Sequence, residues 1–326
     1  MTGHSAVPLV GFVLGSTFHP AELITVARAL EDNGFDSVWS TEDYFMTGGV
    51  SGAAVILGAT ERLLVGTGLL SAYARHPALT AMESATLASA HPGRFRLGLG
   101  AGGLEWLDQQ GIGHARPLSA VRGNVATVRA LLAGEEVSGD HGGFRFDGVR
   151  LHFLPEKAPP IFIGATGPKM TALAGEVADG LLLSVFSSPA FVRGQREIVA
   201  AASGGRDTHI STFAFFALGD TTEEARAKAR PVLAAYLNAE SALMTDAIGI
   251  TEDLNALLAE GGEAALLAKM PDSWIDQLCV CGDLDTCMTR IHELAAAGSG
   301  EVALAPVTID SLTHDIEKLG LALRAG

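Results

Sequence analysis

Two adjacent carboxylic acids, Glu42 and Asp43, follow a short apolar segment that is predicted to be a buried strand. Burying a carboxylate is costly unless the group accepts hydrogen bonds or exchanges protons, so the pair is a candidate for acid–base catalysis. The alternative is a solvated helix start at which Asp43 serves as a cap. His19 also follows a predicted strand and is a candidate for substrate contact, although capping or surface placement explains it equally well.

A glycine run at residues 98–103 fits the G-x-G-x-x-G pattern of dinucleotide-binding turns. In those turns a helix begins at once and an acidic residue follows about 20 residues later. Here the next predicted helix begins near Leu118, the segment near residue 120 is apolar and basic, and the strand before the run is the fourth of its series. The spacing therefore disfavours a dinucleotide site. It leaves two interpretations: glycines that ease a tight strand end, or glycines that let a flat ligand approach the backbone.

Glycines also mark two other predicted strand ends. Gly66 and Gly68 lie inside an apolar segment, which indicates a bulge or the close approach of a ligand. Gly164 begins a short turn that leads into a helix at Pro168, with Lys169 in the first helical turn. Free N–H groups, the helix dipole and a lysine would suit a phosphate or carboxylate. A simple strand-to-helix turn is the alternative.

Short apolar segments and amphipathic helical segments alternate along the chain, which predicts a (β/α)8 barrel, with parallel strands covered on both faces. We treat residues 1–326 as a single domain with two insertions, a hairpin near 135–159 and a helical segment near 238–277. Active sites of this fold lie at the carboxyl ends of the strands. The predicted strands are 7–15, 37–41, 63–70, 95–100, 160–165, 180–186, 210–218 and 301–307, and the predicted helices are 20–33, 77–90, 118–133, 168–178, 190–202, 223–237, 284–297 and 311–323.

Composition narrows the class of protein. With 22 basic and 37 acidic residues, the formal charge is −15, which repels nucleic acid and anionic membranes. The amino terminus has no signal-peptide pattern, and no uncharged apolar run approaches the roughly 18 residues of a membrane span. Cys279, Cys281 and Cys287 are expected to be buried, reduced thiols rather than metal ligands. These features predict a cytoplasmic protein with a small-molecule substrate and no metal site.

The sequence resembles the luciferase-like flavin and deazaflavin oxidoreductases. Within them it is most similar to the branch that uses coenzyme F420, which includes methylene-tetrahydromethanopterin reductase. The stretches that carry the resemblance are 34–45 (GFDSVWSTEDYF), 63–102, 116–137 and 159–184. Together they cover most of residues 7–186, whereas the last 140 residues show only weak similarity. The stretches are specific to the superfamily and less specific to the flavin that is used.

The resemblance implies a cofactor site assembled from several strand ends. It places a non-prolyl cis peptide at Gly68–Leu69, behind the deazaflavin ring, with Ser71 at the ring edge. The family's phosphate-binding turn matches 164–167, and His19, Glu105 and Trp106 would border the substrate pocket. The implied cofactor-binding residues are Gly68, Leu69, Ser71, Gly100, Gly102, Gly164, Ala165, Thr166, Gly167, Pro168 and Lys169.

Two positions depart from the family pattern. Relatives often carry Asp-His where this chain has Glu42-Asp43, so a carboxylate stands where an imidazole could handle a proton. Asn-Pro usually follows the cis bond, whereas Ser71-Ala72 follows it here.

The resemblance implies hydride transfer between C5 of F420 and a small organic substrate, with Glu42 or Asp43 as the proton donor or acceptor. The main alternative is a monooxygenase that uses reduced FMN supplied by a separate flavin reductase. A non-catalytic binding protein is a further possibility, because the histidine is missing. The family also implies a homodimer.

Overall fold

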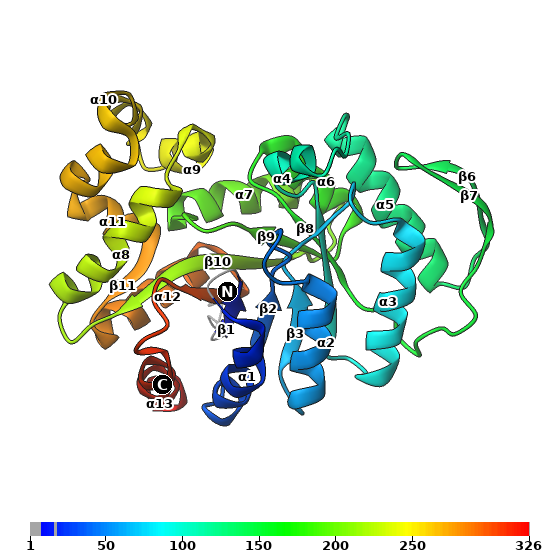
Figure 1. The fold of residues 1–326 in the computed structure, drawn as a ribbon, viewed down its shortest axis with the longest axis horizontal. Coiled ribbons are helices and arrows are strands. Elements are labelled where there is room, and N and C mark those ends of the chain that lie inside the picture. Colours follow the sequence, from blue (N-terminus) through cyan, green and yellow to red (C-terminus); the bar gives the residue numbers. More distant parts are fainter. Residues whose placement is uncertain (1–7, 16–17, 326) are drawn as a thin grey trace.

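Parallel strands close into a barrel in the computed structural model, which describes residues 8–15 and 18–325 (Figure 1). The barrel closes because β12 pairs with both β1 and β10, and β10 also pairs with β9. The predicted (β/α)8 barrel is therefore confirmed; residue 7, the predicted start of the first strand, lies outside the described residues. The barrel strands are β1 (Leu9–Leu14), β2 (Ser37–Ser40), β3 (Leu64–Thr67), β5 (Phe95–Gly100), β8 (Ile161–Gly164), β9 (Gly180–Leu183), β10 (His209–Leu218) and β12 (Glu301–Pro306).

The predicted helices form within a few residues of their expected bounds. Proline occupies the first turn of several of them, where its missing N–H costs nothing. Asp283 caps its helix by accepting a hydrogen bond from Thr286 N at 2.9 Å. These helices are α1 (Leu23–Asp32, after a 3-10 turn at Pro20–Glu22), α3 (Pro77–Ala90), α5 (Pro117–Leu132), α6 (Pro168–Val177), α7 (Pro189–Ala202), α8 (Thr222–Tyr236), α12 (Leu284–Ala297) and α13 (Leu312–Ala325).

Two helices were not predicted: α2 (Gly49–Ala59) and α4 (Leu104–Gln109). The α2 segment, GVSGAAVILGA, has little polar periodicity and contains three glycines, so it lacks an amphipathic signal. Tertiary packing explains one of these glycines, because a Cβ at Gly52 would lie 2.3 Å from Ser40 Oγ on β2. The six-residue α4 is too short to show a helical period.

The strand predictions need two corrections. The predicted strand 63–70 is interrupted at Gly68–Leu69, so that β3 ends at Thr67 and a short β4 (Leu70–Ser71) pairs separately with β5. A further strand, β11 (Cys279–Gly282), pairs with the outer end of β10. It was missed because a four-residue segment between helices carries little pattern. Burial of its two cysteines is confirmed, as is that of Cys287 in α12.

Both predicted insertions are confirmed, and they lie at opposite ends of the molecule (Figure 1). The hairpin consists of β6 (Val137–His141) and β7 (Phe144–Val149), which pair in antiparallel fashion beyond α5. The helical insertion comprises a 3-10 turn η2 (Ala239–Ser241), α9 (Ala242–Asp246), α10 (Thr251–Lys269) and α11 (Asp272–Leu278).

Within residues 8–15 and 18–325, no helix has the length and apolarity needed to cross a membrane.

A buried ion pair crosses the barrel interior. Arg96 on β5 donates two hydrogen bonds to the carboxylate of Glu301 on β12, at 2.8 and 2.9 Å. Trp39 Nε1 donates to the same carboxylate at 3.0 Å, and the Arg96 guanidinium lies 4.4 Å from the centre of the Trp39 ring. Burial by itself would raise the pKa of Glu301, but the positive charge of Arg96 and the hydrogen bonds hold that pKa well below its usual value.

Glycines make room for the large rings inside the barrel. A Cβ at Gly66 would lie 2.3 Å from the Trp39 ring, and one at Gly180 would lie 2.2 Å from the Phe162 ring. A Cβ at Gly98, in the glycine run, would lie 2.0 Å from the carbonyl oxygen of Thr67. The first part of that run therefore allows β5 to approach β3 closely.

Candidate active site

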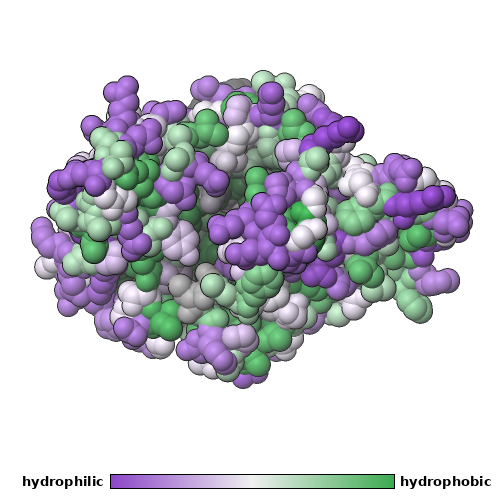
Figure 2. All heavy atoms as spheres, turned by 45° about the horizontal axis from the view of Figure 1, so that its top comes forward, coloured by the Kyte–Doolittle hydropathy of each residue, from purple (hydrophilic) through white to green (hydrophobic). Residues whose placement is uncertain are grey.

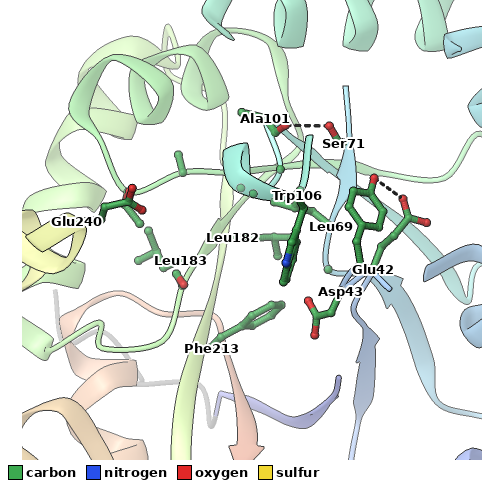
Figure 3. A pocket seen from close by; sticks show the side chains of 18 residues that line it. Glu42, Asp43, Leu69, Ser71, Ala101, Trp106, Leu182, Leu183, Phe213 and Glu240 are labelled. Carbon is green, nitrogen blue, oxygen red and sulfur yellow. Dashed lines mark hydrogen bonds between the residues drawn. The ribbon is translucent and has the colours of Figure 1, made fainter. Parts of the chain in front are cut away.

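A cavity of about 440 Å³ opens at the carboxyl ends of the barrel strands, within the usual size range of small-molecule pockets. Figure 2, which turns the top of Figure 1 toward the viewer, shows the molecule hollowed near its middle, with hydrophilic residues on the rim. Figure 3 shows the side chains around the cavity. The described lining residues are Glu42, Asp43, Tyr44, Gly68, Leu69, Ser71, Ala101, Gly102, Gly103, Trp106, Gly164, Ala165, Thr166, Leu182, Leu183, Ser184, Phe213 and Glu240.

Leu69 forms part of the cavity wall, and its side chain fills space that two glycines leave. A Cβ at Gly164 would lie 2.1 Å from Leu69 Cδ2, and one at Gly100 would lie 2.7 Å from the same atom. Gly100 is not among the described lining residues, so its visible role is to accommodate Leu69 rather than to contact a ligand. The Gly68–Leu69 peptide is cis, as the resemblance implied, and a second non-prolyl cis peptide joins Tyr44 and Phe45.

Ser71 lies on the cavity wall next to the loop that follows β5. Its Oγ donates a hydrogen bond to the Ala101 carbonyl oxygen at 2.8 Å and accepts one from Tyr73 N at 3.2 Å. Gly102 has a φ of +83°, and a Cβ there would lie 2.8 Å from the Ser71 Cβ. The loop can therefore pass this close to Ser71 only with glycine at position 102.

Glu42 is held by partners on the side away from the middle of the cavity. Its carboxylate accepts hydrogen bonds from Arg75 Nη2 at 3.0 Å, Tyr44 Oη at 3.2 Å and Gly49 N at 3.3 Å. Arg75 also pairs with Glu83 at 2.9 Å. Burial, followed by the charge and hydrogen bond of Glu42, raises the pKa of Tyr44 well above its usual value. Tyr44 therefore keeps its proton.

Asp43 points toward the open part of the cavity. Its Oδ2 accepts a hydrogen bond from Thr41 Oγ1 at 2.7 Å. Figure 3 shows the carboxylate directed toward the space between the Trp106 indole and the Phe213 ring, whereas Glu42 turns toward Tyr44. The two adjacent acids therefore have different surroundings, which the sequence could not distinguish.

The turn after β8 connects the cavity with a neighbouring hollow. Gly164, Ala165 and Thr166 line the cavity, whereas 167–169 line the hollow together with Pro117, Leu118 and Met170. Gly167 is the N-cap residue of α6, and no side chain caps that helix end. The backbone N–H groups of the first turn of α6 consequently remain available to an anion.

Two expected substrate contacts do not line the cavity. His19 is exposed, and its Nδ1 accepts a hydrogen bond from Ala21 N at 3.2 Å, so the ring caps the 3-10 turn at Pro20–Glu22. Glu105 is exposed in the first turn of α4. Trp106, the next residue, does line the cavity, because consecutive helical residues point in directions about 100° apart.

Several lining residues were missed by sequence reasoning. Leu182, Leu183 and Ser184 sit at the carboxyl end of a predicted strand, so their position offered a signal, whereas Phe213 is an ordinary apolar residue within its strand. Glu240 belongs to the helical insertion, and nothing in the local sequence brings it to the barrel mouth. The missed residues are Tyr44, Ala101, Gly103, Leu182, Leu183, Ser184, Phe213 and Glu240.

A sequence model described as luciferase-like monooxygenase matches residues 3–301. The chain belongs to this family. It is 33% identical over 285 residues to a 5,10-methylenetetrahydromethanopterin reductase from Methanolobus tindarius, covering 85% of this chain and 87% of the relative. It is also 36% identical over 186 residues to an F420-dependent glucose-6-phosphate dehydrogenase from Nakamurella multipartita, covering 53% of this chain and 54% of the relative.

Solved structures share the fold. A coenzyme F420-dependent tetrahydromethanopterin reductase from Methanopyrus kandleri matches with a TM-score of 0.83 and 21% identity, over 97% of this chain and 98% of the other. An F420-dependent secondary alcohol dehydrogenase, solved with an F420–acetone adduct, matches with a TM-score of 0.79 and 19% identity, over 98% of this chain and 99% of the other. The monooxygenase RslO1 from Streptomyces bottropensis matches with a TM-score of 0.74 and 20% identity, over 97% of this chain and 98% of the other.

Proposed function

We propose that this family member is a coenzyme F420-dependent oxidoreductase that transfers a hydride between the cofactor and a small organic substrate. The observation that carries the proposal is the wall of the cavity at Leu69, which is apolar and seated against Gly100 and Gly164. No side chain from positions 100 or 164 rises beside it, so a planar ring can lie against it. Relatives whose names specify F420 support the choice of cofactor.

The residues present fit this cofactor. The Gly68–Leu69 segment, Ser71 and Gly102 would contact the ring system, and the turn from Gly164 to Gly167 would receive the phosphate. Behind that turn, the uncapped N-terminus of α6 and the exposed Lys169 offer hydrogen-bond donors and positive charge. When bound, F420 supplies a carbon centre, C5, that accepts or donates a hydride.

Asp43 is the residue that we propose to move a proton at the substrate. Its carboxylate faces the cavity and can accept a proton from a substrate hydroxyl or, when protonated, donate one. Glu42 acts instead as a positioning residue, because Arg75, Tyr44 and Gly49 N occupy its carboxylate. The cavity walls hold the substrate close to the ring and limit the access of water.

A parallel titration with F420 and with FMN, followed by absorbance and fluorescence, tests the proposal. We expect micromolar binding of F420, on the order of the lower KM values of enzymes, and far weaker binding of FMN. Stronger binding of FMN, particularly in its reduced form, would contradict the proposal. It would support the alternative, a monooxygenase served by a separate flavin reductase.

A further inference from the structure

We infer that the substrate carries a positively charged nitrogen, held between Asp43 and Glu240 at the mouth of the cavity. This inference rests on the proposed function, because it describes the substrate of the same site. It concerns the charge of the cavity wall, which the expected contacts with a cofactor ring leave unexplained.

The described part of the cavity wall is negatively charged. Among its lining residues are Glu42, Asp43 and Glu240, and none of the lining residues that the structure describes is lysine, arginine or histidine. The Arg75 side chain balances Glu42, but it is shared with Glu83 and lines a neighbouring cavity instead. An anionic substrate would therefore meet repulsion inside the cavity, whereas a cation would be attracted.

The two remaining carboxylates come from different parts of the chain. Asp43 follows β2, and Glu240 lies in the 3-10 turn η2 of the helical insertion. In Figure 3 their side chains stand on opposite sides of the cavity, with the Trp106 and Phe213 rings between them. A substrate group between these carboxylates also meets aromatic rings, and ring faces attract substituted ammonium groups.

Glu240 is consequently a specificity-determining residue contributed by the insertion. It is exposed at the rim, so its carboxylate can stay charged without the cost of burial. The relatives named glucose-6-phosphate dehydrogenases act by name on a sugar phosphate. The described lining of this cavity offers such a phosphate no cationic side chain.

Binding of three small probes to the full chain without cofactor tests the inference. Choline carries a trimethylammonium group, 3,3-dimethylbutan-1-ol is its neutral isostere, and 3,3-dimethylbutanoate is an anionic counterpart. We expect calorimetry to show choline binding about 10-fold more tightly than the neutral alcohol, with the anion weakest. Glu240→Gln should reduce this preference by about 2- to 5-fold. Glu263→Gln, which removes an exposed charge on α10 away from the cavity, should leave it unchanged.

Equal or tighter binding of the neutral alcohol would overturn the inference, as would the same loss of preference in both variants. A parallel titration of each variant with F420 separates this result from the proposed function. Normal F420 binding without a choline preference would contradict the cation site only. A choline preference without F420 binding would support the cation site and contradict the proposed cofactor.

Discussion

Adjacent acidic residues take different roles because their side chains leave the backbone in different directions. Glu42 turns toward Arg75 and Tyr44, whereas Asp43 faces the cavity. The charge of Glu42 is compensated in place, so that residue fixes the loop after β2. Asp43 is the acid that can reach a substrate.

Replacing Asp43 by Asn should lower kcat by about 100-fold or more, because the amide cannot exchange the proton. Affinity for F420 should change little. Steady-state kinetics and an F420 titration measure the two effects. The matched variant Glu42→Gln should instead destabilise the fold by about 1–3 kcal/mol, since Arg75 loses a charged partner. A Glu42→Gln variant that loses as much kcat as Asp43→Asn, with unchanged stability, would reverse the two roles.

Lys169 provides a second test at the level of one side chain. It lies exposed in the first turn of α6, beside the turn proposed to bind the cofactor phosphate. Lys169→Ala should weaken F420 binding by about 2- to 5-fold, the size expected of an exposed charge pair. The variant should bind a dephosphorylated form of the cofactor as well as the parent protein does. Equal losses for both forms would place the phosphate elsewhere.

At the scale of secondary structure, glycines at the strand ends set how closely the barrel elements approach one another. Gly66 receives the Trp39 ring, Gly98 lets β5 approach Thr67, and Gly164 receives Leu69. A glycine in a strand normally weakens it. Here each missing Cβ allows a contact with a neighbouring strand or with the cavity wall, which explains why the glycine-rich stretches belong to a barrel and not to a dinucleotide turn.

A pair of glycine variants distinguishes this packing from ordinary backbone freedom. Gly164→Ala should displace Leu69, raise the Kd for F420 by about 10-fold or more, and lower stability by about 1–3 kcal/mol through overpacking. Gly58→Ala is the control, because Gly58 lies in α2 with no atom within 4 Å of the added Cβ. It should raise stability by about 0.5–1 kcal/mol. Chemical denaturation and F420 titration measure both, and an unaffected Gly164→Ala variant would contradict the packing argument.

At the scale of the whole molecule, one carboxylate connects strands that are distant in sequence. Glu301 on β12 accepts hydrogen bonds from Arg96 on β5, from Trp39 on β2 and from Ser211 Oγ on β10, the last at 2.5 Å. Each strand contributes a donor, and together the donors compensate for burying the charge. The network lies inside the barrel and fixes the Trp39 ring, which in turn packs near Phe213 of the cavity wall with ring centroids 5.8 Å apart.

This network makes the stability of the barrel depend on pH. Because the pKa of Glu301 is lower in the folded than in the unfolded chain, its contribution is present above the unfolded value, near 4.5, and is lost as the pH falls toward the folded value. Glu301→Gln should lower the unfolding free energy at pH 7 by about 3–5 kcal/mol, since Arg96 stays buried without its counter-charge. The difference from the parent protein should shrink at acidic pH.

Urea denaturation at several pH values between about 7 and 3 measures this dependence. Glu317→Gln, at an exposed site on α13, is the control and should change stability by less than about 0.5 kcal/mol. A difference between the Glu301 variant and the parent protein that stays constant with pH would contradict the role of the Glu301 charge.

The sequence by itself determined the order of barrel strands, most helices and both insertions, because local apolar periods and Pro and Gly boundaries act within about 15 residues of the chain. It also located the strand ends that form the cavity, including Asp43, Gly68 and the turn after Gly164. The tertiary structure alone decided which of the two acids faces the cavity, why glycine is required beside Leu69, and that Glu240 reaches the barrel mouth. Those facts depend on side-chain direction and on contacts between elements far apart in sequence, and no local pattern encodes either.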